Sequence, residues 1–265
     1  MKRVCKLFIS KKMRVVDMQV PCDLKLNYFR MKYFIKHILS IINKTVSSVV
    51  FLLSSKRGNQ IYLPHLFFRS AYSFSGNLNQ ISIAGLTEKS KIFIDGENNK
   101  VVINKASIRN TLISVTGKNN QIICEDNVQL NNATLIVRGT NCKIQIGASS
   151  NFGGIRIVNV GFNNDVSIGN HCVFADFIEI WASDTHSIYN EDGNFINPEQ
   201  PITIGNNVWV GSHATILKGV DIGDGAVIGM NTTVTKNILP RSLNVGYPAR
   251  CIKENIKWTL QYEHE

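Results

Sequence analysis

The chain has 265 residues, of which 44% are hydrophobic and 18% charged, so it is too apolar for a disordered chain and long enough to bury a substantial core. Its formal net charge is +10, yet residues 1–87 hold 14 Lys and Arg against only Asp17 and Asp23, and the other 178 residues hold 15 basic against 17 acidic side chains. The basicity is therefore N-terminal, which argues against a protein that coats nucleic acid along its whole length.

Residues 1–70 are predicted to form a basic, partly helical extension. Apolar residues recur at helical spacing between residues 26 and 53, with Arg30, Lys36 and Lys44 among them. These charges interrupt the apolar run before it reaches the roughly 20 residues that a membrane span needs. Two interpretations stay open: a helix packed on the main domain or a partner subunit, which we favour, or peripheral binding of residues 25–53 to an anionic membrane surface.

Beyond residue 70 the sequence repeats. Five segments share a glycine, an asparagine-rich turn and a short alternating strand, and their glycines are 20, 21, 22 and 22 residues apart: 76–83, 96–103, 117–124, 139–146 and 161–168. A second strand follows midway in each unit, as at 91–94 and 112–115. One unit cannot bury its own apolar face, whereas stacked units can, so the pattern predicts a β-solenoid.

The repeat is interrupted at residues 181–201, an excursion that contains Asp184-Thr-His186-Ser187. After it the period shortens to six, with an aliphatic side chain at each repeat: Ile204, Val210, Ile216, Ile222, Ile228 and Val234. A helix repeats at 3.6 residues and a strand at 2, so this period indicates short strands separated by regular corners around a narrow apolar prism. Long loops that leave such a scaffold commonly carry function.

The hexads resemble the hexapeptide-repeat acyltransferases, closely over residues 160–255 and loosely over 71–160. The resemblance implies a mainly β protein with a left-handed parallel β-helix over residues 71–250, a short tail at 251–265, and a homotrimer with sites between adjacent solenoids. The Asp-x-His-x-Ile loop, the asparagine-rich coils and the ending 246–258 are most similar to capsular polysaccharide and polysialic acid O-acetyltransferases. Galactoside-type members have His-Pro in the loop, where this chain has His186-Ser187.

This resemblance implies roles for individual residues. His186 would be the general base, since an imidazole can take the proton of a hydroxyl that attacks a thioester, and Trp209 would pack against substrate or coenzyme. Asp184 or a backbone carbonyl would orient the imidazole, with Glu199 a weaker candidate. The other matches to coenzyme-binding positions are Gly211 and Ser212 at the oxyanion donor, and Thr235, Lys236, Arg250 and Lys253 near the coenzyme phosphates. Met230 stands where the family has a small residue, and no role is expected for it.

The cysteines and histidines give no sign of a metal site. The cysteines form no C-x-x-C pair and lie far apart: Cys5, Cys22, Cys124, Cys142, Cys172 and Cys251. We expect free thiols in a reducing compartment, and with no convincing signal peptide we expect a cytoplasmic location, with the inner membrane face as the site of peripheral binding. A γ-type carbonic anhydrase is disfavoured because His171, His186 and His213 do not match the spacing of its three zinc ligands.

The function expected from these observations is direct acetyl transfer from acetyl-CoA, as a co-substrate, to a carbohydrate hydroxyl in bacterial surface polysaccharide such as capsule or O-antigen. No acyl-enzyme is expected, because no Ser or Cys nucleophile accompanies His186 in a recognisable arrangement. Two alternatives stay open: a non-enzymatic solenoid scaffold, and an acetyltransferase with a small acceptor such as a sugar or serine.

Overall fold

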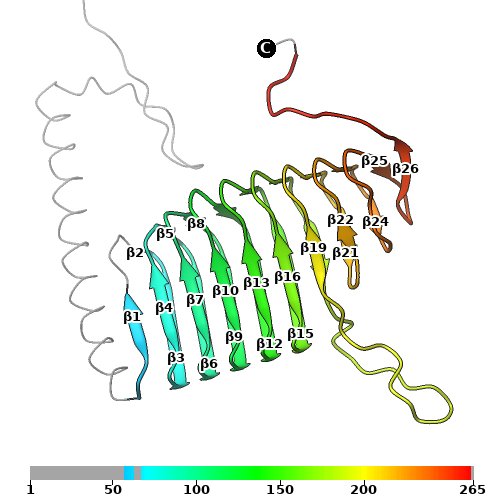
Figure 1. The fold of residues 1–265 in the computed structure, drawn as a ribbon. Helices are drawn as coiled ribbons and strands as arrows, with labels where there is room; N and C mark the ends of the chain where they lie inside the picture. The colour runs from blue at the N-terminus through cyan, green and yellow to red at the C-terminus, as the bar shows by residue number, and fades with distance from the viewer. Residues whose placement is uncertain (1–56, 63–66, 264–265) are drawn as a thin grey trace, which may run out of the picture. The chain divides into compact units, whose positions relative to one another are not determined.

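The computed structural model describes residues 57–62 and 67–263, which wind into a parallel β-solenoid of about eight turns (Figure 1). The mainly β solenoid that the repeats predict is confirmed. The segment 25–53, predicted to be helical, lies outside the described residues. Within the described ranges there is no helix long and apolar enough to cross a membrane.

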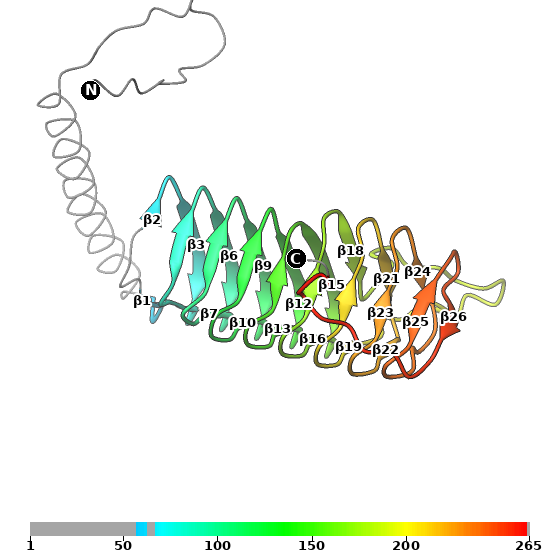
Figure 2. The same cartoon turned by 90° about the horizontal axis from the view of Figure 1, so that it is seen from above.

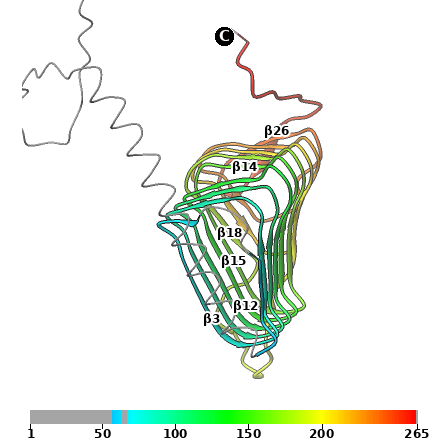
Figure 3. The same ribbon diagram turned by 90° about the vertical axis from the view of Figure 1, so that its left-hand side faces the viewer.

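Three sheets form the wall of the solenoid, and each coil contributes one strand to each sheet (Figure 3). Sheet A contains β1 (Gln60–Tyr62), β4 (Gln80–Ile83), β7 (Lys100–Ile103), β10 (Gln121–Cys124), β13 (Lys143–Ile146), β16 (Asp165–Ile168), β19 (Ile202–Ile204) and β22 (Asp221–Ile222). Sheet B contains β2 (Phe67–Phe68), β5 (Leu86–Glu88), β8 (Ser107–Arg109), β11 (Gln129–Asn131), β14 (Asn151–Phe152), β17 (Val173–Phe174), β20 (Trp209–Val210), β23 (Val227–Ile228), β25 (Leu243–Val245) and β26 (Arg250–Lys253). Sheet C contains β3 (Ala71–Asn77), β6 (Lys91–Glu97), β9 (Leu112–Lys118), β12 (Thr134–Thr140), β15 (Ile155–Phe162), β18 (Ile178–Trp181), β21 (Thr215–Leu217) and β24 (Thr233–Val234).

The core is a set of ladders in which each inward side chain stacks on its counterpart in the next coil. In sheet A one ladder has members at most 1% exposed: Ile81, Val101, Ile122, Ile144, Val166 and Ile202. Full burial of such a side chain contributes about 1.5–3 kcal/mol. In sheet B the rings of Phe152 and Phe174 stack with centroids 4.6 Å apart. Alternation along each strand therefore produces one continuous core, and the coils stack along a single direction (Figure 2).

The glycine and asparagine pattern forms the corner between sheets C and A. Gly96 has φ +114°, and a Cβ there would collide with the carbonyl oxygen of Gly117 in the next coil. Asn98 has φ 54°, a left-handed conformation that asparagine tolerates. The next residue, Asn99, is buried and donates from its side-chain amide to the Gly117 carbonyl at 2.9 Å. The asparagine of the repeat satisfies the corresponding carbonyl at Gly96 and Gly139, and at Gly161 the Cys142 thiol takes its place.

The coils of the solenoid contain fewer residues after the excursion than before it. Sheet A partners are 20 to 22 residues apart as far as Asp165, and Thr203 and Asp221 are only 18 apart. Strand β18 pairs with only the first half of β15, from Ile155 to Val158. The Glu199 carboxylate covers part of the remaining edge by accepting a hydrogen bond from the Phe162 N–H at 2.5 Å.

Both ends of the solenoid differ from the boundaries expected from sequence. Strand β1 already pairs with β4, so the first coil begins before residue 71. At the other end β26 begins at Arg250 and pairs antiparallel with β25, so the tail expected at 251–265 starts inside sheet B. Strand β1 lies before residue 76, where the first of the five repeat segments begins, and β26 follows a reversal of chain direction that the six-residue period does not predict.

Candidate functional site

The excursion forms a hairpin arm that projects from the corner between sheets C and A (Figure 1). Tyr189 and Phe195 form an antiparallel bridge, and the Ile196 N–H donates to the Ile188 carbonyl at 2.9 Å. At the base of the arm the Gln200 N–H donates to the Ala182 carbonyl at 3.2 Å. The two ends of the arm are therefore held together, and residues 182–201 form a defined structure on the scaffold.

His186 lies in the first half of this arm, before the bridge at Tyr189, and is exposed. Its backbone carbonyl accepts a hydrogen bond from the Asn197 side-chain amide at 2.9 Å. Across residues 57–62 and 67–263, no side chain or backbone group is hydrogen-bonded to its imidazole. The ring is thus held through its backbone and is open to an incoming molecule.

Asp184 binds other partners than the imidazole. Its Oδ2 accepts from Lys218 Nζ at 2.5 Å and from Asn197 Nδ2 at 2.8 Å. Thr185 has φ 62°, so the chain turns sharply between Asp184 and His186. Partial burial would raise the pKa of Asp184, but the hydrogen bonds from Lys218 and Asn197 outweigh this effect and hold the pKa below its ordinary value.

Glu199, the weaker candidate for orienting the imidazole, is bonded to the Phe162 N–H. In the structure its carboxylate therefore covers the step in the solenoid wall, where β15 continues beyond the end of β18, and it is not hydrogen-bonded to His186. Sequence reasoning missed both the step and the bond, because Glu199 and Phe162 are 37 residues apart.

Trp209 lies on β20 in sheet B with 43% of its surface exposed. The indole of Trp258, from the C-terminal tail, is 6.0 Å away between ring centroids at an interplanar angle of 43°. Trp258 Nε1 donates to the Asn207 carbonyl at 2.7 Å, which ties the tail to the residues just before β20. Sequence reasoning included Trp258 in the tail motif without placing it beside Trp209.

Gly211 and Ser212 form the corner between sheets B and C, and their backbone N–H groups differ. The Gly211 N–H donates to the Ile228 carbonyl at 2.8 Å and is part of the inter-coil ladder. The Ser212 N–H has no hydrogen-bond partner in the described part of the chain, although the Ser212 carbonyl accepts from Asn231. Of the two expected oxyanion donors, only Ser212 has its N–H available.

The remaining candidates lie at the C-terminal end of the solenoid. Thr235 and Lys236 are exposed just after β24, and Arg250 and Lys253 are exposed on β26. The Arg250 guanidinium donates to the Ala249 carbonyl at 2.8 Å. None of the three cations forms an ion pair within the ranges that the structure describes. Their charges are therefore available to an anionic ligand.

Within one chain the candidates fall into two groups, which lie at opposite ends of the sheet C strands. Strand β21 lies between the corner at Ser212 and Lys218, and Lys218 is bonded to the arm that carries His186. At about 3.3 Å per residue the two corners are on the order of 10 Å or more apart. In the end-on view of Figure 3 the arm emerges at the bottom, whereas β14 and β26 of sheet B lie at the top. One chain alone therefore does not bring His186 to Trp209 and Ser212.

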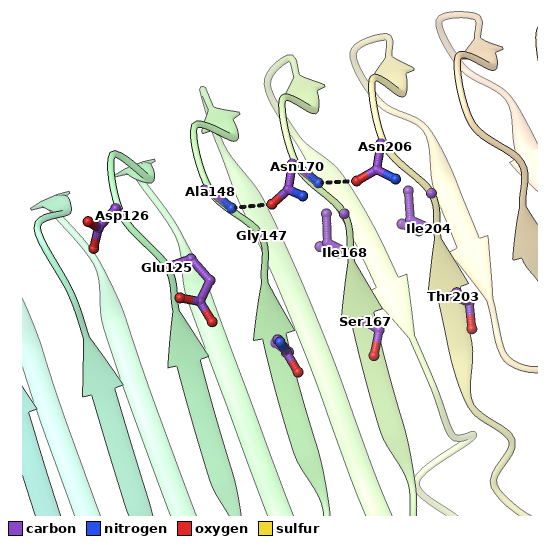
Figure 4. Close-up of a pocket in the computed structure, with 13 residues that line it drawn as sticks. Glu125, Asp126, Gly147, Ala148, Ser167, Ile168, Asn170, Thr203, Ile204 and Asn206 are labelled. Carbon is purple, nitrogen blue, oxygen red and sulfur yellow. Dashed lines mark hydrogen bonds between the residues drawn. The ribbon is translucent and has the colours of Figure 1, made fainter.

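A hollow at the corner between sheets A and B contains none of the candidates. It lies beside a ladder of asparagines in which Asn170 Oδ1 accepts from the Ala148 N–H at 2.8 Å and Asn206 Oδ1 from the Asn170 N–H at 2.9 Å (Figure 4). These bonds repeat from coil to coil and support the corner. Among the described residues, no three His, Cys, Asp or Glu side chains gather as a metal site would require.

Comparison with known proteins identifies relatives of this chain. Residues 201–236 match the hexapeptide repeat of succinyl-transferase. The polysialic acid O-acetyltransferase of Neisseria meningitidis is 35% identical over 198 residues, which cover 73% of this chain and 91% of that protein. The galactoside O-acetyltransferase of Escherichia coli K12 is 57% identical over 54 residues, or 20% of this chain and 27% of that protein.

Among solved structures, the polySia-specific acetyltransferase NeuO matches with a TM-score of 0.61 and 27% identity, over 78% of this chain and 87% of that one. The resemblance that the hexads and the arm predicted is confirmed. The chain therefore belongs to the hexapeptide-repeat O-acetyltransferases and is a homologue, over 73% of its length, of a polysialic acid O-acetyltransferase.

Proposed function

We propose that this protein transfers the acetyl group of acetyl-CoA to a sugar hydroxyl of a bacterial surface polysaccharide, with a sialic acid capsule as the first acceptor to test. The observation that carries the proposal is the match to a polysialic acid O-acetyltransferase over 91% of that protein's length. The winding proposed with it is the left-handed β-helix of the hexapeptide-repeat family. The acceptor is supported by this relationship alone.

The chemistry proposed for the site needs two contributions from the chain. The His186 imidazole takes the proton of the acceptor hydroxyl as its oxygen attacks the thioester carbonyl carbon. The Ser212 N–H donates a hydrogen bond to the oxyanion that develops there, which is supported by its lack of another partner in the described residues. Collapse of the tetrahedral species breaks the C–S bond, and the proton passes to the departing thiolate.

The coenzyme is proposed to lie along the B–C corner toward the C-terminal end. Trp209 presents an exposed indole to it, and Lys236, Arg250 and Lys253, which form no ion pair among the described residues, supply positive charge for its phosphates. Thr235 stands beside Lys236 and is exposed as well. Glycine is needed at position 211 because an added Cβ would lie 2.7 Å from the Met230 nitrogen of the next coil.

The separation of the two groups supports a homotrimer in which the arm of one chain meets Trp209 and Ser212 of its neighbour. The outer face of sheet C lies between them and carries a row of side chains in register that is apolar except at Ser114 and includes the buried Val158: Phe93, Ser114, Ile136, Val158, Trp181 and Leu217. Three copies with this face toward a common axis would place each arm beside the next B–C corner.

We also propose that the enzyme is cytoplasmic and binds the inner face of the cell membrane. The test is to compare how much of the full-length protein, and how much of a variant without residues 1–60, is found in the membrane fraction of cells.

The test is acetyl transfer to purified polysialic acid, measured by mass spectrometry of the glycan after incubation with labelled acetyl-CoA. His186→Asn should lower kcat by about 10²- to 10⁴-fold, the usual contribution of a general base. His171→Asn is the matched control, because His171 is exposed, distant from the arm, and in a left-handed conformation that asparagine tolerates. Near-normal turnover by His186→Asn would overturn the mechanism, and a wild-type protein that neither binds nor turns over acetyl-CoA would indicate a scaffold.

A further inference from the structure

Three polar side chains from different parts of the chain meet beside the His186 backbone, and none of them is hydrogen-bonded to its ring. Asp184 begins the arm, Asn197 ends it, and Lys218 follows β21 in the next coil. Lys218 and Asp184 are 34 residues apart in sequence, and their ion pair joins the arm to the rigid wall.

Asn197 is at the centre of this cluster. Its Nδ2 donates to both Asp184 Oδ2 at 2.8 Å and the His186 carbonyl at 2.9 Å, and its Oδ1 accepts from the Ile188 N–H at 2.6 Å. Lys218 Nζ also donates to the Asn197 backbone carbonyl at 3.0 Å. The segment from Asp184 to Ile188 is thereby fixed at its start, at its middle and at its end.

The ion pair is placed to resist movement of the arm. The Lys218 side chain is only 18% exposed and that of Asp184 is 44% exposed, so the ammonium is largely shielded from water while its partner is partly solvated. Within the described residues, Asp184 is the only carboxylate that pairs with Lys218. Loss of Lys218 would therefore leave Asp184 without its charge partner and Asn197 without one of its donors.

We propose that Lys218, Asp184 and Asn197 are positioning residues that hold the His186 backbone against the solenoid and thereby set where the imidazole meets the acceptor hydroxyl. This inference rests on the proposed role of His186 as the base. The bonds of the cluster hold the arm and involve none of the residues proposed to bind the coenzyme, so its loss should alter kcat and leave acetyl-CoA binding largely unchanged. A displacement of about 1 Å at a reacting group can cost as much as 100-fold in rate.

The test compares Lys218→Met with Lys218→Arg, and uses Lys143→Met as the matched control. Lys143 forms another Lys–Asp pair on the solenoid wall, 3.4 Å from Asp165 in sheet A, and within the described residues it is not hydrogen-bonded to Asp184, Asn197 or Lys218. We expect Lys218→Met to lower kcat about tenfold or more with KM for acetyl-CoA within about twofold, and Lys218→Arg to recover much of the loss. Asp184→Asn combined with Lys218→Met should be little worse than either change alone, because the two residues act as one unit.

A second measurement does not depend on activity. Hydrogen–deuterium exchange of peptides covering residues 184–197 should be faster in Lys218→Met than in the wild type or Lys143→Met. The reason is that Asn197, which accepts the hydrogen bond of the Ile188 N–H, would no longer be held by Lys218. Unchanged kcat and unchanged exchange in Lys218→Met would overturn the positioning cluster. Faster exchange combined with full activity of His186→Asn would overturn the role of His186 as base, and the anchoring of the arm would still stand.

Discussion

The indole of Trp258 lies 6.0 Å from that of Trp209, centroid to centroid, and donates its N–H to the Asn207 carbonyl. This contact folds the C-terminal tail back over the face of sheet B that carries Trp209. The tail is held again where the Ile256 N–H donates to the Arg241 carbonyl at 3.0 Å. Residues after β26 therefore form one side of the proposed coenzyme site.

The Trp258 contact predicts an effect on coenzyme binding. In Trp258→Ala we expect KM for acetyl-CoA to rise about two- to tenfold, since an aromatic pair contributes about 0.5–1.5 kcal/mol beyond its buried area. The kcat value should change less, because Trp258 contacts the residues proposed to bind the coenzyme and has no proposed role in proton transfer. Steady-state kinetics with varied acetyl-CoA checks this, and Trp258→Phe, which keeps a ring and removes the N–H, should be intermediate. An unchanged KM in the alanine variant would contradict the prediction.

The Glu199 bond predicts a modest loss of stability. Glu199→Ala removes the acceptor from the Phe162 N–H and should lower the free energy of unfolding by about 1 kcal/mol, the usual net contribution of an accessible hydrogen bond. Glu199→Gln retains a carbonyl oxygen and should lose less. Urea unfolding followed by circular dichroism measures both variants. Equal midpoints for the wild type and the alanine variant would show that solvent replaces the carboxylate at no cost.

The apolar row on sheet C predicts the response of the assembly to charge. Leu217 pairs with Trp181 on the outer face, and Leu217→Lys should lower the mass in solution from trimer toward monomer at micromolar concentration. Ile123→Lys is the matched control, because Ile123 also faces outward but lies in sheet A. Size-exclusion chromatography with light scattering gives both masses. A wild-type monomer, or a trimer in both variants, would argue against sheet C as the subunit interface.

The buried cysteines predict a pattern of thiol reactivity. Burial raises the pKa of Cys124 to about 12 and that of Cys172 to about 11, and it also raises the pKa of Cys142. At pH 8 a thiol-specific reagent should therefore modify the exposed Cys251 and spare these three until the protein unfolds. Mass spectrometry of labelled peptides checks this, and rapid labelling of folded Cys124 would contradict the core.

The same pKa shifts set the direction of the pH dependence. A raised pKa means that the folded protein holds the thiol proton more tightly than the unfolded chain does, so its stability decreases as the pH rises above the ordinary thiol value of 9.0. Asp184 has a lowered pKa, so the ion pair with Lys218 persists through mild acid and is lost only below the ordinary aspartate value of 3.8. Loss of activity between pH 5 and pH 7 would therefore not come from Asp184.

Much of this molecule could be predicted from its sequence because a solenoid is built from local repeats. Gly96 and Asn98 indicate a corner by themselves, since each adopts a positive φ that few other residues tolerate. The six-residue period from Ile204 onward likewise reports short strands whose inward side chains stack. Asp184, His186 and Trp209 could be selected because they interrupt or follow that regular pattern.

The contacts that complete the site could not be predicted in this way, because each joins residues brought together only by the stacking of coils. Lys218 reaches Asp184 across one coil, Glu199 reaches Phe162 across the step in the wall, and Trp258 reaches Trp209 from the tail. The sequence by itself determined the solenoid, its corners and the residues of chemical interest, since these depend on period and residue type. Only the tertiary structure decided that the Asp184 carboxylate binds Lys218 and Asn197 in place of the His186 ring, and that sheet C separates His186 from Ser212. The physical reason is that neighbours in a solenoid are set by how many residues each coil contains, and the arm and the narrowing of the wall change that number.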